Sequence, residues 1–296
     1  MQIFHSGRLL SMLMVGAVLQ ACSSVTAINT ASQNSLNAVQ ETSGLVCDNQ
    51  GLWTINDSGN SPHIYQVDPQ QSRITQTIAT NADNLDWEAL TIQDNRLIIA
   101  DIGNNSGKRQ DISFYVVTWP AQAGKTAKTQ RIDIAYPAGP IGPLRPYQHN
   151  LDAEALAASP DGLFLFSKNW LADSSTVYRV DLQQPALTVH AEISGLPGML
   201  TDASWAAQSQ LFVATGYHNI RKHGVMFALT GDFQPFLAFI DRHFKVIKVL
   251  PLDTQGQVEG VCVDKQQQIW LSQEQSDHHA AKFWRWGTVP VALAQQ

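Results

Sequence analysis

The stretch DWEALTIQDNRLIIADIGNN, residues 86–105, contains the pattern that decides the fold. Its two apolar runs are joined by the polar segment QDNR, which is the pattern of two strands connected by a tight turn. Glu88 opens the first run, and Asp101 ends the second run 13 positions later. A further aromatic and β-branched run, ISFYVVTW at residues 112–119, predicts a third strand.

The same pattern occurs four more times along the chain. Each copy has two apolar runs joined by Asp, Asn, Gly or Gln, followed by an aromatic or β-branched run. A repeat of roughly 45 to 65 residues with several strands per copy is typical of a β-propeller, in which each copy forms one blade. The sequence therefore predicts an all-β chain folded as a five-bladed propeller. The other four copies begin with ETSGLVCDNQGLWTINDSGN (41–60), DAEALAASPDGLFLFSKNW (152–170), TDASWAAQSQLFVATGYHN (201–219) and QVEGVCVDKQQQIWLSQE (257–274).

More polar, alternating segments predict the outermost strand of most blades. They are residues 73–79, 130–135, 186–193 and 244–250. The fifth copy lacks such a segment, and we expect either residues 288–293 or residues 36–39 to complete it.

A six-bladed ring is the alternative, because residues 121–150 form an unusually long stretch between two copies. The second half of this stretch, PAGPIGPLRPYQHN, is too rich in Pro and Gly to hold a β-ladder. We therefore expect it to be a loop lying across one face of the ring.

The first 21 residues resemble a signal peptide that ends in a lipoprotein cleavage site. His5 and Arg8 precede an apolar stretch, residues 9–19, which is too short for a stable transmembrane anchor. The next residues, LQAC ending at Cys22, resemble a bacterial lipobox. This resemblance implies that the mature chain begins at a lipidated Cys22 and that Ser23 directs it to the outer membrane. An ordinary secretory signal with a chance cysteine is the alternative.

We therefore divide the chain into a signal peptide (1–21), a lipidated polar tether (22–40) and a propeller domain (41–296). The lipid is the only membrane attachment that we expect, and the sequence leaves open which face of the outer membrane carries the protein. A net charge of −6 and the absence of a basic run argue against nucleic-acid binding. We expect a monomer whose partner is a small ligand or another protein.

Two cysteines remain after Cys22, and export places them in an oxidising compartment. Cys47 and Cys262 both lie in the first strand of their copies, and these copies become neighbours when the ring closes. A disulfide between them would clasp the ring. Neighbouring innermost strands diverge, however, so we expect two buried thiols that lie too far apart for a bond.

Five short motifs, taken together, resemble a family of exported bacterial β-propeller proteins that often carry lipid anchors and have no agreed activity. They are DWEAL (86–90), DIGNN (101–105), DAEAL (152–156), SKNW (167–170) and VEG (258–260). The strand openings also resemble, more distantly, those of calcium-dependent propeller enzymes such as phytases and lactonases. Copy four departs from the pattern with Asp202 in place of glutamate, and copy one has Ser43 at that position.

Acidic side chains are expected to converge at one end of the ring. The first strand of each blade lines the central axis, and in an antiparallel hairpin its start lies beside the end of the next strand. Clustered carboxylates repel one another unless they are protonated, paired with a cation or bound to a metal. Mixed carboxylate and amide oxygens suit Ca²⁺ better than a transition metal. The predicted metal ligands are Glu88, Asp101, Glu154, Asp202 and Glu259.

Other side chains are predicted to bind a ligand at the same end of the ring. Lys168 either neutralises the acids or holds an anionic group. His149 is expected to be a solvent-facing loop residue, with a role as an acid or base as the alternative. The acids themselves have a structural alternative, because such residues often bond only backbone amides of the adjoining blade. The predicted ligand-binding residues are Asp57, Lys168, Trp170, Tyr217 and Glu274.

Two functions stay open. The favoured one is a non-catalytic binding propeller at the outer membrane that takes a small ligand or a partner's loop, possibly together with Ca²⁺. The other is a calcium-dependent hydrolase of phosphate esters or lactones, in which Glu88, Asp101, Glu154 and Glu259 hold the metal and Lys168 orients the substrate. The chain has no Gly-x-Ser-x-Gly, His-Glu-x-x-His or Cys-x-x-Cys motif, and no catalytic residue is predicted.

Overall fold

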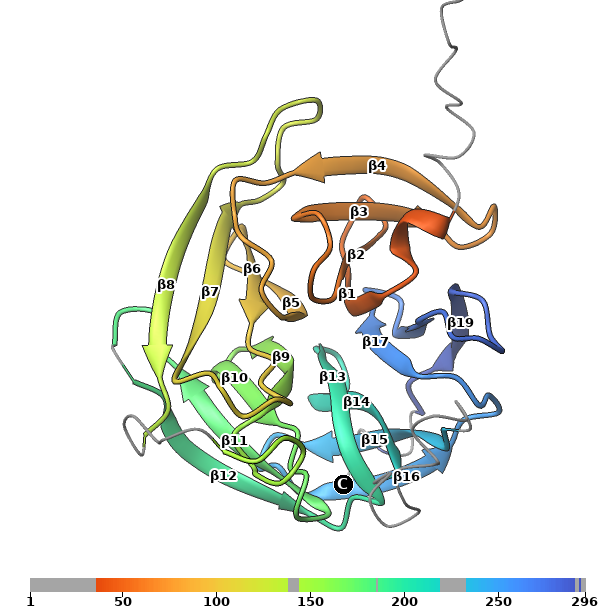
Figure 1. Ribbon diagram of the computed structural model, residues 1–296. Coiled ribbons are helices and arrows are strands. Elements are labelled where there is room, and N and C mark those ends of the chain that lie inside the picture. The colour runs from red at the N-terminus through yellow and green to blue at the C-terminus, as the bar shows by residue number, and fades with distance from the viewer. Residues whose placement is uncertain (1–35, 138–143, 185, 219–232, 291–292, 294–296) are drawn as a thin grey trace, which may run out of the picture.

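The computed structural model describes residues 36–137, 144–184, 186–218, 233–290 and 293. These residues form a β-propeller of five antiparallel blades (Figure 1). The predicted all-β class and blade number are confirmed, and the six-bladed alternative is wrong. None of the helices in the described part of the chain is long and apolar enough to cross a membrane.

The blades follow one another in chain order, and the first strand of each lies innermost (Figure 1). Blade one has β1 (Thr42–Cys47), β2 (Leu52–Asn56), β3 (His63–Asp68) and β4 (Arg73–Ala79). Blade two has β5 (Trp87–Gln93), β6 (Arg96–Asp101), β7 (Asp111–Thr118) and β8 (Thr129–Ala135). Blade three has β9 (Ala153–Ser159), β10 (Gly162–Ser167), β11 (Ser174–Val180) and β12 (Thr188–Ser194). Blade four has β13 (Gly198–Ala206), β14 (Leu211–His218), β15 (Pro235–Asp241) and β16 (Val246–Pro251). Blade five has β17 (Val258–Val263), β18 (Gln268–Gln273) and β19 (Lys282–Thr288).

The hydrophobic core is divided into layers between neighbouring blades. Trp53 and Trp87 are fully buried between blades one and two, and Phe164 and Phe212 are buried between blades three and four. The outermost strands are half exposed: β4 buries only Ile74 and Ile78, which matches the alternation in its sequence. Each blade is therefore stabilised mainly by its two neighbours, and the ring has to close for the end blades to be covered.

Closure of the ring differs from expectation. Among the described residues blade five has three strands, because residues 36–39 form the 3-10 helix η1 (Leu36–Val39) instead of a strand. Val39 is fully buried in the core shared by blades one and five, next to Leu45 and Phe283. Residues 288–293 do not add a strand either: β19 ends at Thr288, and residues 291 and 292 lie outside the described residues.

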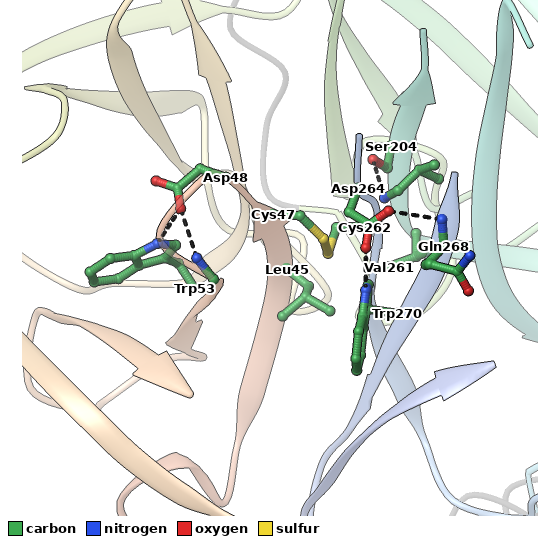
Figure 2. Close-up of a disulfide and its surroundings, with 12 residues drawn as sticks. Leu45, Cys47, Asp48, Trp53, Ser204, Val261, Cys262, Asp264, Gln268 and Trp270 are labelled. Carbon is green, nitrogen blue, oxygen red and sulfur yellow. Dashed lines mark hydrogen bonds between the residues drawn. A yellow bond between two sulfur atoms is a disulfide. The ribbon is translucent and has the colours of Figure 1, made fainter. Parts of the chain in front are cut away.

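A disulfide joins Cys47 in β1 to Cys262 in β17, with 5.7 Å between the two Cα atoms (Figure 2). The expectation of two separate thiols is wrong, because β1 and β17 lie side by side and bring the cysteines within the normal Cα distance of a disulfide. The turns that follow the two cysteines are alike. Asp48 accepts a hydrogen bond from Trp53 Nε1 (3.0 Å), and Asp264 accepts one from Trp270 Nε1 (2.9 Å).

The described part of the segment before blade three is a loop, as predicted. Its backbone is tied to the loop that follows β6: the N–H of Leu144 donates to the carbonyl of Gly107, and that of Tyr147 donates to the carbonyl of Asn105, both at 2.9 Å. Residues 138–143 of this segment lie outside the described residues.

Candidate functional site

Every innermost strand carries a β-bulge near its start, and the bulges shape the site. In blade two, Trp87 pairs with Asp101 and Ala89 with Ala100, so Glu88 is left without a partner on β6. A bulge re-aims the extra side chain and bends the strand. The ladder register gives the five bulged residues as Gly44, Glu88, Glu154, Thr201 and Glu259.

This register corrects the sequence alignment of the copies. In blades one and four, the position equivalent to the glutamates is occupied by Gly44 and Thr201. Ser43 and Asp202 lie one residue away from it. A shift of one residue turns a strand side chain to the opposite face. Three of the five bulges therefore present a glutamate at the end of the ring where the innermost strands begin. We call this end the mouth; its acidic side chains include Asp57, Asp86, Glu88, Glu154, Glu259 and Glu274.

Asp57, Asp86 and Glu88 lie closest to one another. One carboxylate oxygen from each lies within 4.8 Å of the other two, a spacing that suits shared coordination of one metal ion. Asp57 follows β2 in blade one, and its carbonyl accepts a hydrogen bond of 2.8 Å from the side-chain amide of Asn84. Asp86 and Glu88 flank the start of β5, so the cluster bridges two blades.

Gly103 leaves room for this cluster. A Cβ atom at position 103 would collide with Oε1 of Glu88 and Oδ2 of Asp86. The glycine is fixed by its neighbours, because its N–H donates to the carbonyl of Asp86 (3.2 Å) and its carbonyl accepts from Arg109 (3.0 Å). The loop after β6 therefore packs directly against the acids without filling the space around their oxygens.

The acids at the mouth hold their protons more tightly than usual. Burial, followed by repulsion from Asp57, raises the pKa of Glu274 to about 8. The same two causes raise the pKa of Asp86 to about 7. Burial is also the main reason why the pKa values of Glu88 and Glu259 lie well above the ordinary value. A cation bound among these groups would replace the protons.

Lys168 lies on the blade-three side of the mouth and forms a buried ion pair with Glu154. Its Nζ atom also lies 5.1 Å from the ring centre of Trp170 and 5.2 Å from that of Tyr217. Burial lowers the pKa of Lys168, but the nearby Glu154, Tyr217, Glu259 and Asp152 together outweigh burial, so the pKa lies well above its ordinary value and the amine is charged. The other oxygen of Glu154, Oε2, is buried and has no hydrogen-bond partner in the described structure.

Two of the predicted metal ligands have other partners. The carboxylate of Asp202 accepts backbone hydrogen bonds from Leu45 (3.1 Å), Ala203 (2.8 Å) and Val261 (2.8 Å), and so links blade four to blades one and five. Asp101 is fully buried and pairs with Arg109, with 2.6 Å between Oδ1 and the guanidinium. These contacts agree with the structural alternative, and we leave both residues out of the proposed ligand set.

Three further predicted residues are buried. Trp170 and Tyr217 are only 4% and 3% exposed, and their rings flank Lys168. His149 is buried, and the expectation of a solvent-facing residue is wrong. Its Nδ1 accepts a hydrogen bond of 3.2 Å from the N–H of Leu151, and its Nε2 has no hydrogen-bond partner among the described residues.

Sequence reasoning missed Asp86 and Asp152 as members of the site. The available signal was the repeated Asp-x-Glu at the start of copies two and three. The two aspartates differ in their partners, which the repeat alone does not show. Asp152 accepts hydrogen bonds from the N–H of Asn104 (2.6 Å) and from Nε1 of Trp170 (2.7 Å), and so fixes the mouth loops of two blades, whereas Asp86 belongs to the acid cluster.

Comparisons with known proteins add little beyond the fold. No protein-family model matches the sequence, and no curated protein is similar to it. The resemblance to an exported propeller family therefore stays a prediction.

Among solved structures, the chain is similar to hydrazine synthase of Kuenenia stuttgartiensis, with 14% identity over 81% of this chain and a TM-score of 0.42; it spans 57% of that chain. It is similar to PQQ-bound aldose sugar dehydrogenase from Streptomyces coelicolor, with 9% identity over 83% of this chain and 94% of that one and a TM-score of 0.49. It is also similar to regucalcin, a calcium-binding protein from Agrobacterium tumefaciens, with 12% identity over 87% of this chain and 94% of that one and a TM-score of 0.45. Likenesses this low carry no information about ligand or reaction.

Proposed function

We propose that this protein is an exported propeller that binds a divalent cation at the mouth. The oxygen ligands there favour Ca²⁺. With the cation bound, the site holds a small ligand or a loop of a partner protein. The observation that carries the proposal is the cluster of Asp57, Asp86 and Glu88, whose oxygens lie within 4.8 Å of one another. Carboxylate oxygens in a flexible arrangement are the ligands that Ca²⁺ prefers.

Two features of the surrounding residues support a cation. The unpartnered Oε2 of Glu154 is a buried acceptor that a cation or its ligand would satisfy. Gly103 keeps the space next to Glu88 and Asp86 clear of side-chain atoms. Asp57 accepts from the N–H of Ser58 and Glu88 accepts from the hydroxyl of Ser43 (3.4 Å), so each carboxylate keeps lone pairs that a cation can use.

The location of the protein is part of the proposal. The signal peptide and lipidated Cys22 would place the propeller at the outer membrane, attached by its lipid alone. Residues 1–35 lie outside the described residues, so this rests on the sequence. The disulfide between Cys47 and Cys262 supports export, because disulfides persist in oxidising compartments and are rare in the cytosol.

Calorimetric titration of the full chain with Ca²⁺, after treatment with chelator, tests the proposal. We expect measurable binding heat and a higher melting temperature, since a ligand at about 100 times its Kd adds roughly 2.7 kcal/mol of stability. Asp86→Asn should weaken binding at least about tenfold, equivalent to about 1.4 kcal/mol. Asp161→Asn is the matched control, because Asp161 is an exposed acid that pairs with Arg242 away from the cluster. Absence of both the heat and the melting shift would overturn the proposal.

A calcium-dependent hydrolase is the second candidate. It is favoured by Glu274, an acid of the mouth outside the three-residue cluster, whose pKa of about 8 lies near the operating pH at which a general acid or base works best. Lys168 lies close enough to interact electrostatically with Glu274 and would orient the substrate. Screening the Ca²⁺-loaded chain against phosphate esters and lactones tests this candidate, and turnover lost in Asp86→Asn but kept in Asp161→Asn would support it.

A further inference from the structure

The loop between β6 and β7, residues 102–110, holds the acid cluster from one side. The N–H groups of Ile102 and Gly103 both donate to the backbone carbonyl of Asp86, at 3.0 and 3.2 Å. Gly103 also lies so close to the acids that an added Cβ atom would collide with the carboxylate oxygens of Glu88 and Asp86. Two of the three cluster acids therefore lie against this loop, and a shift of the loop would move them.

Arg109 fixes the loop through both ends of its guanidinium. Its Nη1 atom lies 2.6 Å from Oδ1 of Asp101 and donates to the carbonyl of Gly103 at 3.0 Å. Its Nη2 atom donates to the carbonyl of Asp101 at 2.8 Å. The other carboxylate oxygen of Asp101 accepts from the N–H of Leu85 (3.1 Å), the residue before Asp86. The guanidinium therefore holds the loop directly and the start of blade two through Asp101.

The backbone of Arg109 is fixed as well. Its N–H donates to the side-chain oxygen of Asn104 (2.8 Å), and the N–H of Asn104 donates to Oδ1 of Asp152 in blade three (2.6 Å). In the described structure, no hydrogen bond or ion pair joins Arg109 to the three cluster acids. The contacts of Arg109 can therefore shape the cluster through the loop, and the loop is anchored on the side away from the acids.

We propose that Arg109 is the positioning residue of the cation site. Through Gly103 and the loop, it keeps the carboxylates of Asp86 and Glu88 where they can share one cation. This inference rests on the proposed cation site and names the residue that holds its ligands in place. Groups that orient metal ligands without touching the metal matter for binding, and loss of one typically weakens metal affinity about 10- to 100-fold.

Arg109→Lys in the full chain tests this role, with the Ca²⁺ affinity measured by calorimetry. The lysine keeps the positive charge and can still pair with Asp101, but it lacks the planar guanidinium that reaches two backbone carbonyls at once. We expect the Ca²⁺ affinity to fall at least about tenfold. Arg242→Lys is the matched control, because Arg242 is an exposed residue that pairs with Asp161 away from the cluster. It should leave the affinity unchanged.

Two further measurements separate positioning from a general loss of stability. In the Asp86→Asn background, Arg109→Lys should lower the Ca²⁺ affinity much less than in the natural chain, because the two changes act on the same ligand. Tb³⁺, which also prefers oxygen ligands, serves as a luminescent substitute for Ca²⁺. Its luminescence lifetime in water should be shorter in Arg109→Lys than in Arg242→Lys, because misplaced carboxylates leave coordination positions to water.

Gly103→Ala tests the same link without a change at Arg109. Gly103 does not have a left-handed backbone conformation, and the nearest atoms to an added Cβ belong to the side chains of Glu88 and Asp86. Alanine should therefore be compatible with the main chain and push the carboxylates away, so that the Ca²⁺ affinity falls at least about tenfold. This variant decides the matter if Arg109→Lys does not fold.

The outcomes distinguish this inference from the proposed function. An unchanged Ca²⁺ affinity in folded Arg109→Lys or in Gly103→Ala would overturn the inference alone. So would a loss from Arg109→Lys that is equally large with and without Asp86→Asn, or an unchanged Tb³⁺ lifetime. Absence of Ca²⁺ binding to the natural chain would overturn the proposed function, and this inference with it.

Discussion

Cys47 and Cys262 are 215 residues apart in sequence and form a covalent link between blades one and five, at the place where the ring closes. Blades one and five need another contact to hold the ring closed there, because no strand from the other end of the chain completes blade five among the described residues. The disulfide links the two blades by a covalent bond, and the buried Val39 of η1 links them by apolar packing.

Removal of the disulfide should therefore loosen the closure. Cys47→Ala combined with Cys262→Ala is expected to lower the free energy of unfolding by about 2–4 kcal/mol, since a cross-link over a long loop restricts the unfolded chain. Urea unfolding measures the difference. A reductant should lower the stability of the natural chain and leave the double variant unaffected; equal sensitivity of both proteins would show that the clasp has no such role.

The fold could be predicted from the sequence because the repeat is carried by whole strands. Each copy has nearly continuous buried runs in its inner strands, and most copies end in an alternating outer strand; a shift of one residue at a bulge does not hide that pattern. The disulfide could not be predicted, since it depends on how closely β1 approaches β17 at one position, which the repeat does not specify.

Which side chains gather at the mouth could be predicted only where their position follows from the repeat. Glu88 and Glu154 occupy equivalent bulges in the innermost strands of blades two and three, and both lie at the mouth. Asp202 seemed equivalent to them, but it lies one residue beyond the bulge and turns to the backbone of the neighbouring blades. Such an offset comes from local hydrogen bonding, and the spacing of apolar runs is too coarse to reveal it.

Asp202 provides a test that separates structural acids from cation ligands. Its carboxylate accepts three backbone hydrogen bonds, and the single oxygen of an Asn side chain cannot replace both carboxylate oxygens. Asp202→Asn is expected to reduce the free energy of unfolding by about 1–3 kcal/mol, because it leaves a buried N–H poorly satisfied. Calorimetry should show an unchanged Ca²⁺ affinity for the folded variant. A large loss of affinity at full stability would place Asp202 among the ligands instead.

The lipid anchor is testable without reference to the site. If Cys22 carries the lipid, Cys22→Ser should move the protein from the membrane fraction to the soluble periplasm, or leave it as an uncleaved precursor. Fractionation followed by fatty-acid labelling measures both outcomes. A Cys22→Ser protein that is still cleaved, labelled and found with the outer membrane would refute the lipoprotein interpretation.

Stability should depend on pH in a way that Ca²⁺ reverses. The pKa values of Asp86 and Glu274 rise from 3.8 and 4.5 to about 7 and about 8, so the folded chain binds these protons more tightly than the unfolded chain. A raised carboxyl pKa contributes stability that is complete below the unfolded value and is lost as the pH rises through the folded value. With chelator present, the melting temperature is therefore expected to fall between about pH 5 and about pH 8.

Ca²⁺ competes with the same protons, and its effect on stability should follow the opposite trend. Binding to Asp86 requires the ionised carboxylate, so Ca²⁺ affinity should increase as the pH rises toward about 7. Saturating Ca²⁺ is then expected to raise the melting temperature little at about pH 5 and strongly at about pH 8, where it neutralises acids that otherwise repel one another. Asp86→Asn should reduce both the fall in melting temperature with rising pH in chelator and the rise in melting temperature with Ca²⁺. Asp161→Asn should leave both changes as they are in the natural chain. Melting curves at several pH values measure these trends, and an equal gain from Ca²⁺ at about pH 5 and about pH 8 would mean that the cation does not bind at these acids.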